Sequence, residues 1–348
     1  MLRELSVRPR SFPLHSPFRI ARGVKHAAEV VTVELAQAGC VGRGESVPYA
    51  RYGESVAAVI AEIESLRDDL CAGVGRDELQ ARLAPGAARN ALDAALWDLE
   101  ARLTRVPVWS QLARPPHQPL VTALTVSLDT PQAMGQAASN IADAGLIKIK
   151  VDADDPLARI EAVRRAAPAA RLIVDPNESW TIDILRETQD ALVRLKVDLL
   201  EQPLPADADG ALREFSSRVP ICADEACHTV ADLPALVGRY QAINIKLDKT
   251  GGLTEAWRLL RAAKAEGFII MVGCMVCSSL GIAPALEIAR DAEFVDLDGP
   301  FWLVDDYPDG AGLRGGRLMP PPAGFWGGCT RAAASRPGSS TGLFRTTP

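Results

Sequence analysis

The sequence has no apolar run near the about 20 residues that a membrane-spanning helix needs. The longest such stretch, Phe268 to Cys277, is far shorter. The N-terminal segment MLRELSVRPRSF lacks the apolar core of a secretory signal. Positive charge is not in excess either: 44 acidic residues face 38 basic ones, for a net charge of −6. That balance gives no general attraction to nucleic acid or to an anionic membrane. These absences predict a soluble cytoplasmic protein that binds neither.

Cysteine offers neither a disulfide framework nor a zinc site. The seven cysteines are odd in number, and Cys274 and Cys277 have no second pair with which to complete a zinc site. Reduced thiols in the cytoplasm are therefore expected. A dinucleotide site also lacks support, because no predicted strand is followed by G-x-G-x-x-G.

What is present is the composition of a globular protein of about two domains, with 48% hydrophobic and 24% charged residues in 348. Residues 28–36 and 40–45 are β-rich and flank a turn, which predicts an antiparallel hairpin. Helical patterns follow at 54–71, 76–84 and 86–104. We therefore predict an N-terminal α+β domain over residues 1–115.

Short apolar strands alternate with helical segments from residue 119 onward. Eight predicted strands end at intervals of 22 to 27 residues, at Thr125, Lys150, Asp175, Glu201, Asp224, Lys246, Gly273 and Asp298. This regular spacing favours a parallel α/β barrel of the (β/α)7β TIM type over residues 116–323, rather than an open sheet. The remaining residues, 324–348, are rich in Gly, Ser, Arg and Pro and are predicted to be a disordered tail.

Polar side chains end most of these strands, at the barrel face where active sites form. Three carboxylates end consecutive strands (Asp175, Glu201 and Asp224) and would repel one another unless a cation such as Mg²⁺ lay between them. Lysines end the strands on either side (Lys150 and Lys246), and a neighbouring cation would lower the pKa of a lysine enough for it to act as a base. Any one of these residues alone is more often a helix cap, a surface ion pair or a solvated side chain. Their ordered succession argues against coincidence.

At these residues the sequence resembles the enolase superfamily, in its muconate-lactonizing-enzyme-like subgroup. The motifs are IKIK at 147–150, IVDPNESW, EQPLP, ICADE, NIKLDKTGG and DLDGP. Within the subgroup the sequence is most similar to dipeptide epimerases that act on L-Ala-D/L-Glu. Residues 17–25 and 48–55 resemble the two specificity loops of the capping domain. The resemblance implies a Mg²⁺-dependent isomerase of murein peptide metabolism, with one Mg²⁺ per subunit and a dipeptide substrate. A homo-oligomer is compatible with the resemblance.

The resemblance also implies a role for each residue. Lys150 and Lys246 would be the two acid/base catalysts, and the three carboxylates would bind the metal. Lys148 would lie against the substrate carboxylate. Asp296 and Asp298 would hold the substrate ammonium group, and Arg22 would meet the glutamyl carboxylate. Further expected positions are Thr125 and Cys274 at the substrate, although a buried core cysteine is commoner, and Asn177 and Glu225 either beside the metal ligands or as capping residues.

Other functions on the same fold stay open. A dipeptide epimerase of different specificity, an N-acylamino acid racemase, an o-succinylbenzoate synthase or a cycloisomerase would share the lysines and carboxylates. Asp296 and Asp298 favour a substrate with an ammonium group, because an apolar or acylated substrate would leave two carboxylates unbalanced. A rival of another class is a non-catalytic barrel, or one that binds phosphate at Gly251 and Gly252. For these two glycines a turn is the preferred interpretation.

Overall fold

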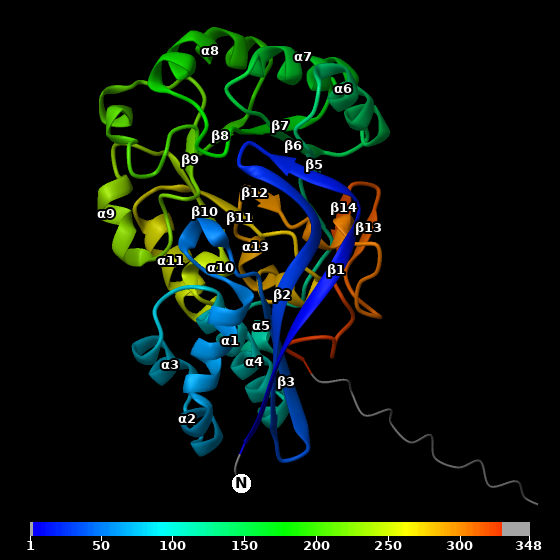
Figure 1. Cartoon of the computed structure of the whole chain (residues 1–348), viewed down its shortest axis with the longest axis vertical. Coiled ribbons are helices and arrows are strands. Elements are labelled where there is room, and N and C mark those ends of the chain that lie inside the picture. The colour runs from blue at the N-terminus through cyan, green and yellow to red at the C-terminus, as the bar shows by residue number, and fades with distance from the viewer. Residues whose placement is uncertain (1–2, 329–348) are drawn as a thin grey trace, which may run out of the picture.

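The computed structural model describes residues 3–328. Its N-terminal part holds a three-stranded antiparallel sheet of β1 (Glu4–Ile20), β2 (Gly23–Gln37) and β3 (Cys40–Ser46), in the order β1-β2-β3. The predicted hairpin is confirmed, since β2 pairs with β3 from Val31–Ser46 to Gln37–Cys40. In Figure 1 the long β1–β2 hairpin runs along the molecule from the cap helices towards β5 and β6.

The sequence patterns did not predict β1. Its three prolines, at positions 9, 13 and 17, obscure the alternation of a strand. Proline is tolerated because β1 is an edge strand, where a missing N–H breaks no inner ladder. The register also shifts between Pro13 and Phe18, so the strand is irregular there.

The cap helices cover one face of this sheet (Figure 1). The predicted helix over 54–71 is divided at Leu66, which lies outside both halves. The last long helix, α4, packs against β3 because Gly42 and Gly44 carry no side chain: a Cβ on Gly44 would lie 2.0 Å from the Ala91 carbonyl oxygen. The helices are η1 (Ala50–Tyr52), α1 (Val56–Ser65), α2 (Arg67–Ala72), α3 (Arg76–Arg82), α4 (Ala87–Thr104) and α5 (Val108–Gln111).

The second part is a parallel barrel of eight strands, which confirms the predicted fold class. The sheet order β12-β11-β10-β9-β8-β7-β6-β5 follows the chain. Its two ends meet where the Ala123 N–H donates to the Val295 carbonyl oxygen at 2.7 Å. The strands are β5 (Leu124–Val126), β6 (Leu146–Lys150), β7 (Arg171–Asp175), β8 (Leu199–Glu201), β9 (Ile221–Ala223), β10 (Ala242–Lys246), β11 (Ile269–Gly273) and β12 (Phe294–Asp296).

The connections are less regular than the constant spacing of the strands suggests. A 3-10 helix, η2 (Gly210–Glu214), stands between β8 and β9 in place of an α-helix. The other helices are α6 (Pro131–Asn140), α7 (Pro156–Ala166), α8 (Ile182–Arg194), η3 (Val230–Asp232), α9 (Leu233–Leu236), α10 (Leu247–Thr250), α11 (Leu253–Ala265), α12 (Ser279–Ile282), α13 (Leu286–Ala289) and η4 (Gly299–Trp302). A small sheet joins β4 (Leu120–Val121), β14 (Arg317–Met319) and β13 (Gly312–Arg314).

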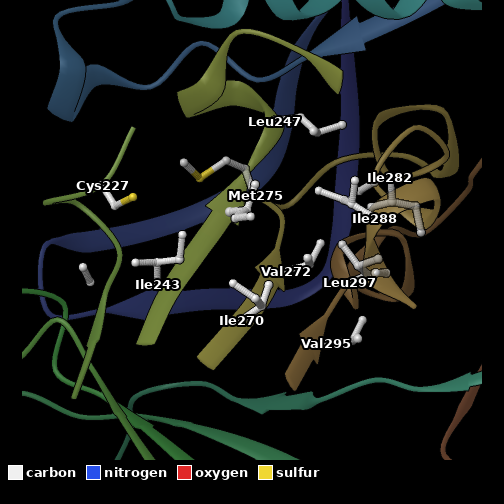
Figure 2. Close-up of a cluster of buried hydrophobic side chains, with 14 of the residues drawn as sticks. Cys227, Ile243, Leu247, Ile270, Val272, Met275, Ile282, Ile288, Val295 and Leu297 are labelled. Carbon is white, nitrogen blue, oxygen red and sulfur yellow. The ribbon is translucent and has the colours of Figure 1, made fainter. Parts of the chain in front are cut away.

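Two apolar layers sandwich the barrel wall. Outward-facing side chains such as Ile243, Ile270 and Val272 pack against the surrounding helices and loops (Figure 2). Inside, the strands or the residues just before them each give one side chain to a separate cluster: Ala123, Leu146, Ile173, Leu199, Cys222, Ala242, Met271 and Phe294. This inner layer closes one end of the barrel and leaves the other end for polar side chains.

The predicted tail differs from the structure at its start. Residues 324–328 pack against the cap: Phe325 and Trp326 are buried, and the Trp326 indole N–H donates to the Arg43 carbonyl oxygen at 3.0 Å. The rest of the predicted tail, 329–348, lies outside the described residues. None of the helices within residues 3–328 combines the length and apolar character needed to cross a membrane. The cytoplasmic location and the domain boundaries stay predictions.

Candidate active site

Side chains alternate between the two faces of a strand, and this alternation brings the predicted strand-end residues together inside the barrel. Each inner apolar residue is followed two positions later by a side chain on the same face, so Leu146 leads to Lys148 and then Lys150. The same step leads from Ile173 to Asp175 and from Leu199 to Glu201. The other members of this polar layer are Thr125, Asp224, Asn244, Lys246 and Asp296, and the corresponding position of β11 is Gly273.

A cavity of about 440 Å³ lies over this layer, between the barrel and the cap. Its cap wall includes Arg22, Lys25 and Tyr49, from the loops predicted to set specificity. The predicted site residues that line it are Arg22, Thr125, Lys148, Lys150, Asn177, Asp224, Glu225, Lys246, Cys274, Asp296 and Asp298. Asp175 and Glu201 lie behind them, fully buried.

Lys148 lies among three carboxylates. Its Nζ is 3.2 Å from Asp175 Oδ2, 2.7 Å from Glu201 Oε2 and 2.8 Å from Asp296 Oδ2. Burial alone would lower the pKa of Lys148, but these carboxylates raise it well above its usual value. Lys148 is therefore a fixed positive charge. Lys150 Nζ contacts Asp175 Oδ2 at 2.5 Å. Although burial opposes the shift, Lys150 and Lys148 lower the pKa of Asp175 to about 2.

Lys246 is held in the same way on the other side of the barrel. Its Nζ is 2.6 Å from Asp224 Oδ2 and 3.9 Å from Glu201 Oε1. The lowered pKa expected for this lysine depends on a bound cation beside it and stays a prediction. Burial lowers the pKa of Lys246, but the contact with Asp224 outweighs burial and raises it.

Asp175, Glu201 and Asp224 have the chemistry of a magnesium site but are not converged on one point. In the part of the chain that the structure describes, no three His, Cys, Asp or Glu side chains are arranged to hold a metal ion as they stand. Lysine ammonium groups lie between the carboxylates instead. The donor set still fits Mg²⁺, since all three residues offer buried carboxylate oxygens; Glu201 Oε2 and Asp224 Oδ1 each face a lysine ammonium group, at 2.7 and 2.8 Å, that a cation could replace. Burial and the charge of Asp175 raise the pKa of Glu201 to about 7, so a cation would relieve an unfavourable charge.

Asp296 and Asp298 form a second acidic group at the end of the eighth strand. Asp296 Oδ1 is buried and accepts no hydrogen bond from the described residues, while Oδ2 faces Lys148. Asp298 Oδ2 accepts from the Thr125 N–H at 2.8 Å and from the Trp302 indole N–H at 3.3 Å. Burial and the neighbouring Asp296 raise the pKa of Asp298 to about 6. Two adjacent carboxylates with spare oxygens are suited to a cationic group.

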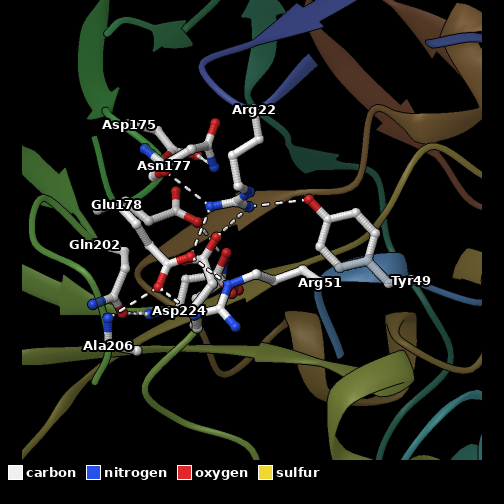
Figure 3. A network of polar contacts seen from close by, with 12 residues as sticks. Arg22, Tyr49, Arg51, Asp175, Asn177, Glu178, Gln202, Ala206 and Asp224 are labelled. Carbon is white, nitrogen blue, oxygen red and sulfur yellow. Dashed lines mark hydrogen bonds and ion pairs between the residues drawn. The ribbon is translucent and has the colours of Figure 1, made fainter. Parts of the chain in front are cut away.

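Arg22 reaches the cavity but is already paired (Figure 3). Its Nη1 donates to the Asn177 carbonyl oxygen and to Glu178 Oε2, both at 2.9 Å. Its Nη2 donates to Tyr49 Oη at 3.0 Å and to Glu225 Oε1 at 2.6 Å. All four Nη hydrogens therefore have acceptors within residues 3–328, and Nε–H is the donor that remains. Glu225, expected near the metal ligands, is buried and anchors this arginine.

Asn177 lies beside Asp175, and Cys274 lies in the cavity wall. The Asn177 backbone N–H donates to Asp175 Oδ1 at 2.9 Å and its side-chain Nδ2 to Asp175 Oδ2 at 3.2 Å, so it orients that carboxylate. Cys274 is half-buried in the cavity wall, close to Gly299, where a Cβ would lie 3.1 Å from its Sγ.

Sequence reasoning missed three polar residues of this region. Asn244 precedes Lys246 by one strand period and donates to Glu201 Oε1 at 2.8 Å, so the alternation could have identified it. Lys249 is buried, with Nζ 2.8 Å from Asp224 Oδ1. Lys25 lines the cavity, with Nζ 5.1 Å from the centre of the Tyr49 ring, and forms no ion pair within residues 3–328. No pattern in the sequence distinguishes these two lysines from solvated ones.

The glycines after the sixth strand do not form a phosphate site. A Cβ on Gly251 would lie 2.5 Å from Arg89 Nε, and one on Gly252 would lie 2.5 Å from Asp93 Oδ2. Both glycines have positive φ, 70° and 111°, which confirms the turn. The space that a phosphate would need is filled by α4.

Comparison with known families covers nearly the whole chain. Residues 2–112 match the mandelate racemase / muconate lactonizing enzyme N-terminal domain, and residues 133–324 match the enolase C-terminal domain-like family. The chain belongs to the enolase superfamily. The resemblance drawn from the strand-end residues is thereby confirmed.

Within the enolase superfamily, the relatives are epimerases and racemases. The L-Ala-D/L-Glu epimerase of Escherichia coli strain K12 is 49% identical over 307 residues, which cover 88% of this chain and 96% of that protein. The N-acetyl-D-glutamate racemase of a Pseudoalteromonas species is 45% identical over 301 residues, with 86% and 95% covered. The predicted enzyme class, an isomerase, agrees with both.

Solved structures of the superfamily give the same result. An enolase family member from Agrobacterium tumefaciens with homology to dipeptide epimerases, bound to sodium and L-Ala-L-Glu, has a TM-score of 0.91 at 47% identity and covers 93% of this chain and 100% of that one. A dipeptide epimerase from Cytophaga hutchinsonii complexed with Mg and D-Ala-L-Val has a TM-score of 0.86 at 26% identity, with 92% and 94% covered. Relatives therefore bind both magnesium and dipeptides.

Proposed function

We propose that this protein is a Mg²⁺-dependent epimerase that inverts the glutamyl α-carbon of L-Ala-D-Glu and L-Ala-L-Glu, in murein peptide metabolism. The observation that carries the proposal is the placement of Lys150 and Lys246. Their strands, β6 and β10, are four apart in a closed barrel of eight, so the two ammonium groups face the cavity from opposite sides. One lysine removes the α-proton and the other returns a proton to the opposite face, which inverts the centre.

The α-proton beside a carboxylate is weakly acidic, so its removal needs positive charge close by. Asp175, Glu201 and Asp224 would hold one Mg²⁺ per subunit, and Asn177 orients the first of them. With the ion held there, these carboxylates would place positive charge where negative charge develops on the substrate. Lys148 adds a preorganised ammonium group beside the same carboxylates, and Asn244 steadies Glu201.

The two ends of the substrate would be recognised by opposite charges. Asp296 and Asp298 take the alanyl ammonium group, for which Asp296 Oδ1 stands ready as an unpartnered acceptor. On the cap side, Lys25 receives the glutamyl carboxylate together with Arg22, whose remaining donor is Nε–H. Burial, together with the nearby Lys246, lowers the pKa of Lys25, although Asp248 opposes the shift, so an added carboxylate is favoured there. Thr125 and Cys274 complete the contacts with the dipeptide.

An N-acylamino acid racemase is the second candidate, because one relative acts on N-acetyl-D-glutamate. Its substrate shares the glutamyl part but carries an amide in place of the ammonium group. The amide would leave Asp296 and Asp298 without a cation. The acidic pair therefore favours the dipeptide.

The test is proton NMR in D2O with Mg²⁺ and either L-Ala-L-Glu or N-acetyl-L-glutamate, with an EDTA control. Metal-dependent loss of the glutamyl α-proton signal, with the other epimer appearing, is expected for the dipeptide. Faster exchange of N-acetyl-L-glutamate would replace the proposed substrate with the second candidate. Exchange that survives EDTA would refute the metal requirement.

A further inference from the structure

Glu178 is a carboxylate of the barrel whose partners come from both cap loops. Its side chain is 7% exposed. It accepts hydrogen bonds from Arg22 Nη1 at 2.9 Å and from Arg51 Nε and Nη2 at 2.8 and 2.9 Å. A fourth comes from the Ala206 N–H at 2.9 Å, in the loop after β8. One side chain thus joins the loop over 17–25, the loop over 48–55 and the barrel rim (Figure 3).

The backbone that presents Glu178 is strained. Asn177 and Glu178 are consecutive non-glycine residues with φ of 48° and 67°, a conformation that L-residues adopt rarely. The Glu178 N–H donates to the Gln202 carbonyl oxygen at 2.9 Å, which holds the turn in place. Two successive left-handed residues cost conformational energy, and such strain persists where a side chain must be aimed at a particular target.

Glu178 itself does not line the cavity, whereas both of its arginine partners do. It balances two guanidinium charges, with Arg51 in the two-pronged geometry that is the strongest form of this pair. Among the described residues, the 48–55 loop also contacts the barrel through Tyr52, whose ring centre lies 4.7 Å from that of His228. Without Glu178, Arg51 would lose both of these hydrogen bonds to the barrel, while Arg22 would keep the Asn177 carbonyl oxygen, Tyr49 and Glu225.

We propose that Glu178 is a positioning residue that fastens both cap loops over the cavity and so sets the affinity for substrate. It acts through Arg22 and Arg51 and touches neither the substrate nor the reacting lysines. Its loss therefore weakens substrate retention while the proton transfer stays intact. The kinetic part of this proposal rests on the proposed function, but the structural part does not.

The experiment compares Glu178→Gln, Arg51→Met and the double variant with the parent enzyme. Hydrogen–deuterium exchange followed by mass spectrometry is expected to show faster exchange in 17–25 and 48–55 for all three variants. With L-Ala-L-Glu, the KM of Glu178→Gln should be roughly tenfold higher than that of the parent, and kcat should stay within about twofold. The tenfold figure lies between the loss expected for breaking an exposed charge pair and that for breaking a buried one. The double variant should be no worse than Glu178→Gln alone.

The matched control is Asp190→Asn, which removes another arginine–carboxylate pair between barrel elements, with side chains 56% and 83% exposed. It should leave exchange and kinetics unchanged. Because Arg51 is more than a third exposed, Arg51→Met keeps the test open even if Glu178→Gln fails to fold. Unchanged exchange in both loops, or a lower kcat at unchanged KM, would overturn the proposal. If the parent epimerises no dipeptide, the proposed function fails, and the exchange data still decide whether Glu178 fastens the loops.

Discussion

Glu45→Gln should make the stability of the protein less sensitive to a rise in pH from 5 to 8. Glu45 lies on β3, is buried, and accepts hydrogen bonds from the Ser278 N–H at 2.9 Å and the Ser278 hydroxyl at 2.6 Å. Burial raises its pKa from the ordinary 4.5 to about 7, even though these hydrogen bonds oppose the shift. The folded protein therefore holds this proton more tightly than the unfolded chain does, and stability is lost as the pH rises from 4.5 through 7.

The size of the effect follows from the two pKa values. Each pH unit between them corresponds to about 1.4 kcal/mol, so complete ionisation lowers the free energy of unfolding by about 3 kcal/mol. Glutamine has nearly the same shape and cannot ionise. Urea unfolding followed by circular dichroism should therefore show Glu45→Gln gaining about 2–3 kcal/mol on the parent between pH 5 and pH 8.

Asp154→Asn is the control, because its side chain is 91% exposed. Its stability should follow that of the parent across the same pH range. A constant difference between Glu45→Gln and the parent at pH 5 and pH 8 would show that the buried carboxyl does not titrate in this window, and the reasoning from burial would be wrong.

Three further predictions concern the proposed reaction. Lys150→Ala and Lys246→Ala should each abolish epimerisation in the NMR assay, while the remaining lysine still exchanges the α-proton of one epimer with D2O; normal epimerisation by either variant would refute the two-base assignment. Asp298→Asn should raise the Kd for L-Ala-L-Glu far more than it changes the melting temperature, and equal losses would indicate a structural role. Gly273→Ala should lower kcat at least about tenfold, because the new Cβ would lie 2.8 Å from Asn244 and 3.2 Å from Lys246 Cε; an unchanged kcat would mean that this lysine tolerates displacement.

The barrel could be predicted because the sequence of each strand alone shows which of its side chains face the interior. A side chain that follows an inner apolar residue by two positions must face the same interior, so the ends of β6, β7, β8 and β10 specify their own contribution to the site. The same rule would have identified Asn244. The 3-10 helix after β8 was missed because spacing counts residues and does not reveal which helix type connects two strands.

The cap could not be predicted to the same depth, since its contacts join distant parts of the chain. Arg22 was expected at the cavity, and it is there, but its pairing with Glu178 and Glu225 crosses more than 150 residues. Lys25 and Lys249 look alike in sequence. One lies over Tyr49 in the cavity wall and the other is buried under Asp224, and only the packing of cap and barrel separates them.

The ion pairs of the polar layer also determine how clearly a substitution there reports on catalysis. Breaking one pair inside a barrel leaves the partner charge buried and unbalanced, which costs stability independently of any chemistry. Lys148 faces three carboxylates, whereas Lys150 contacts only Asp175 among the described ion pairs. Loss of activity at Lys148 would therefore mix folding with catalysis, while loss at Lys150 reports more directly on proton transfer. The residue with the fewest structural partners gives the cleanest evidence for the reaction.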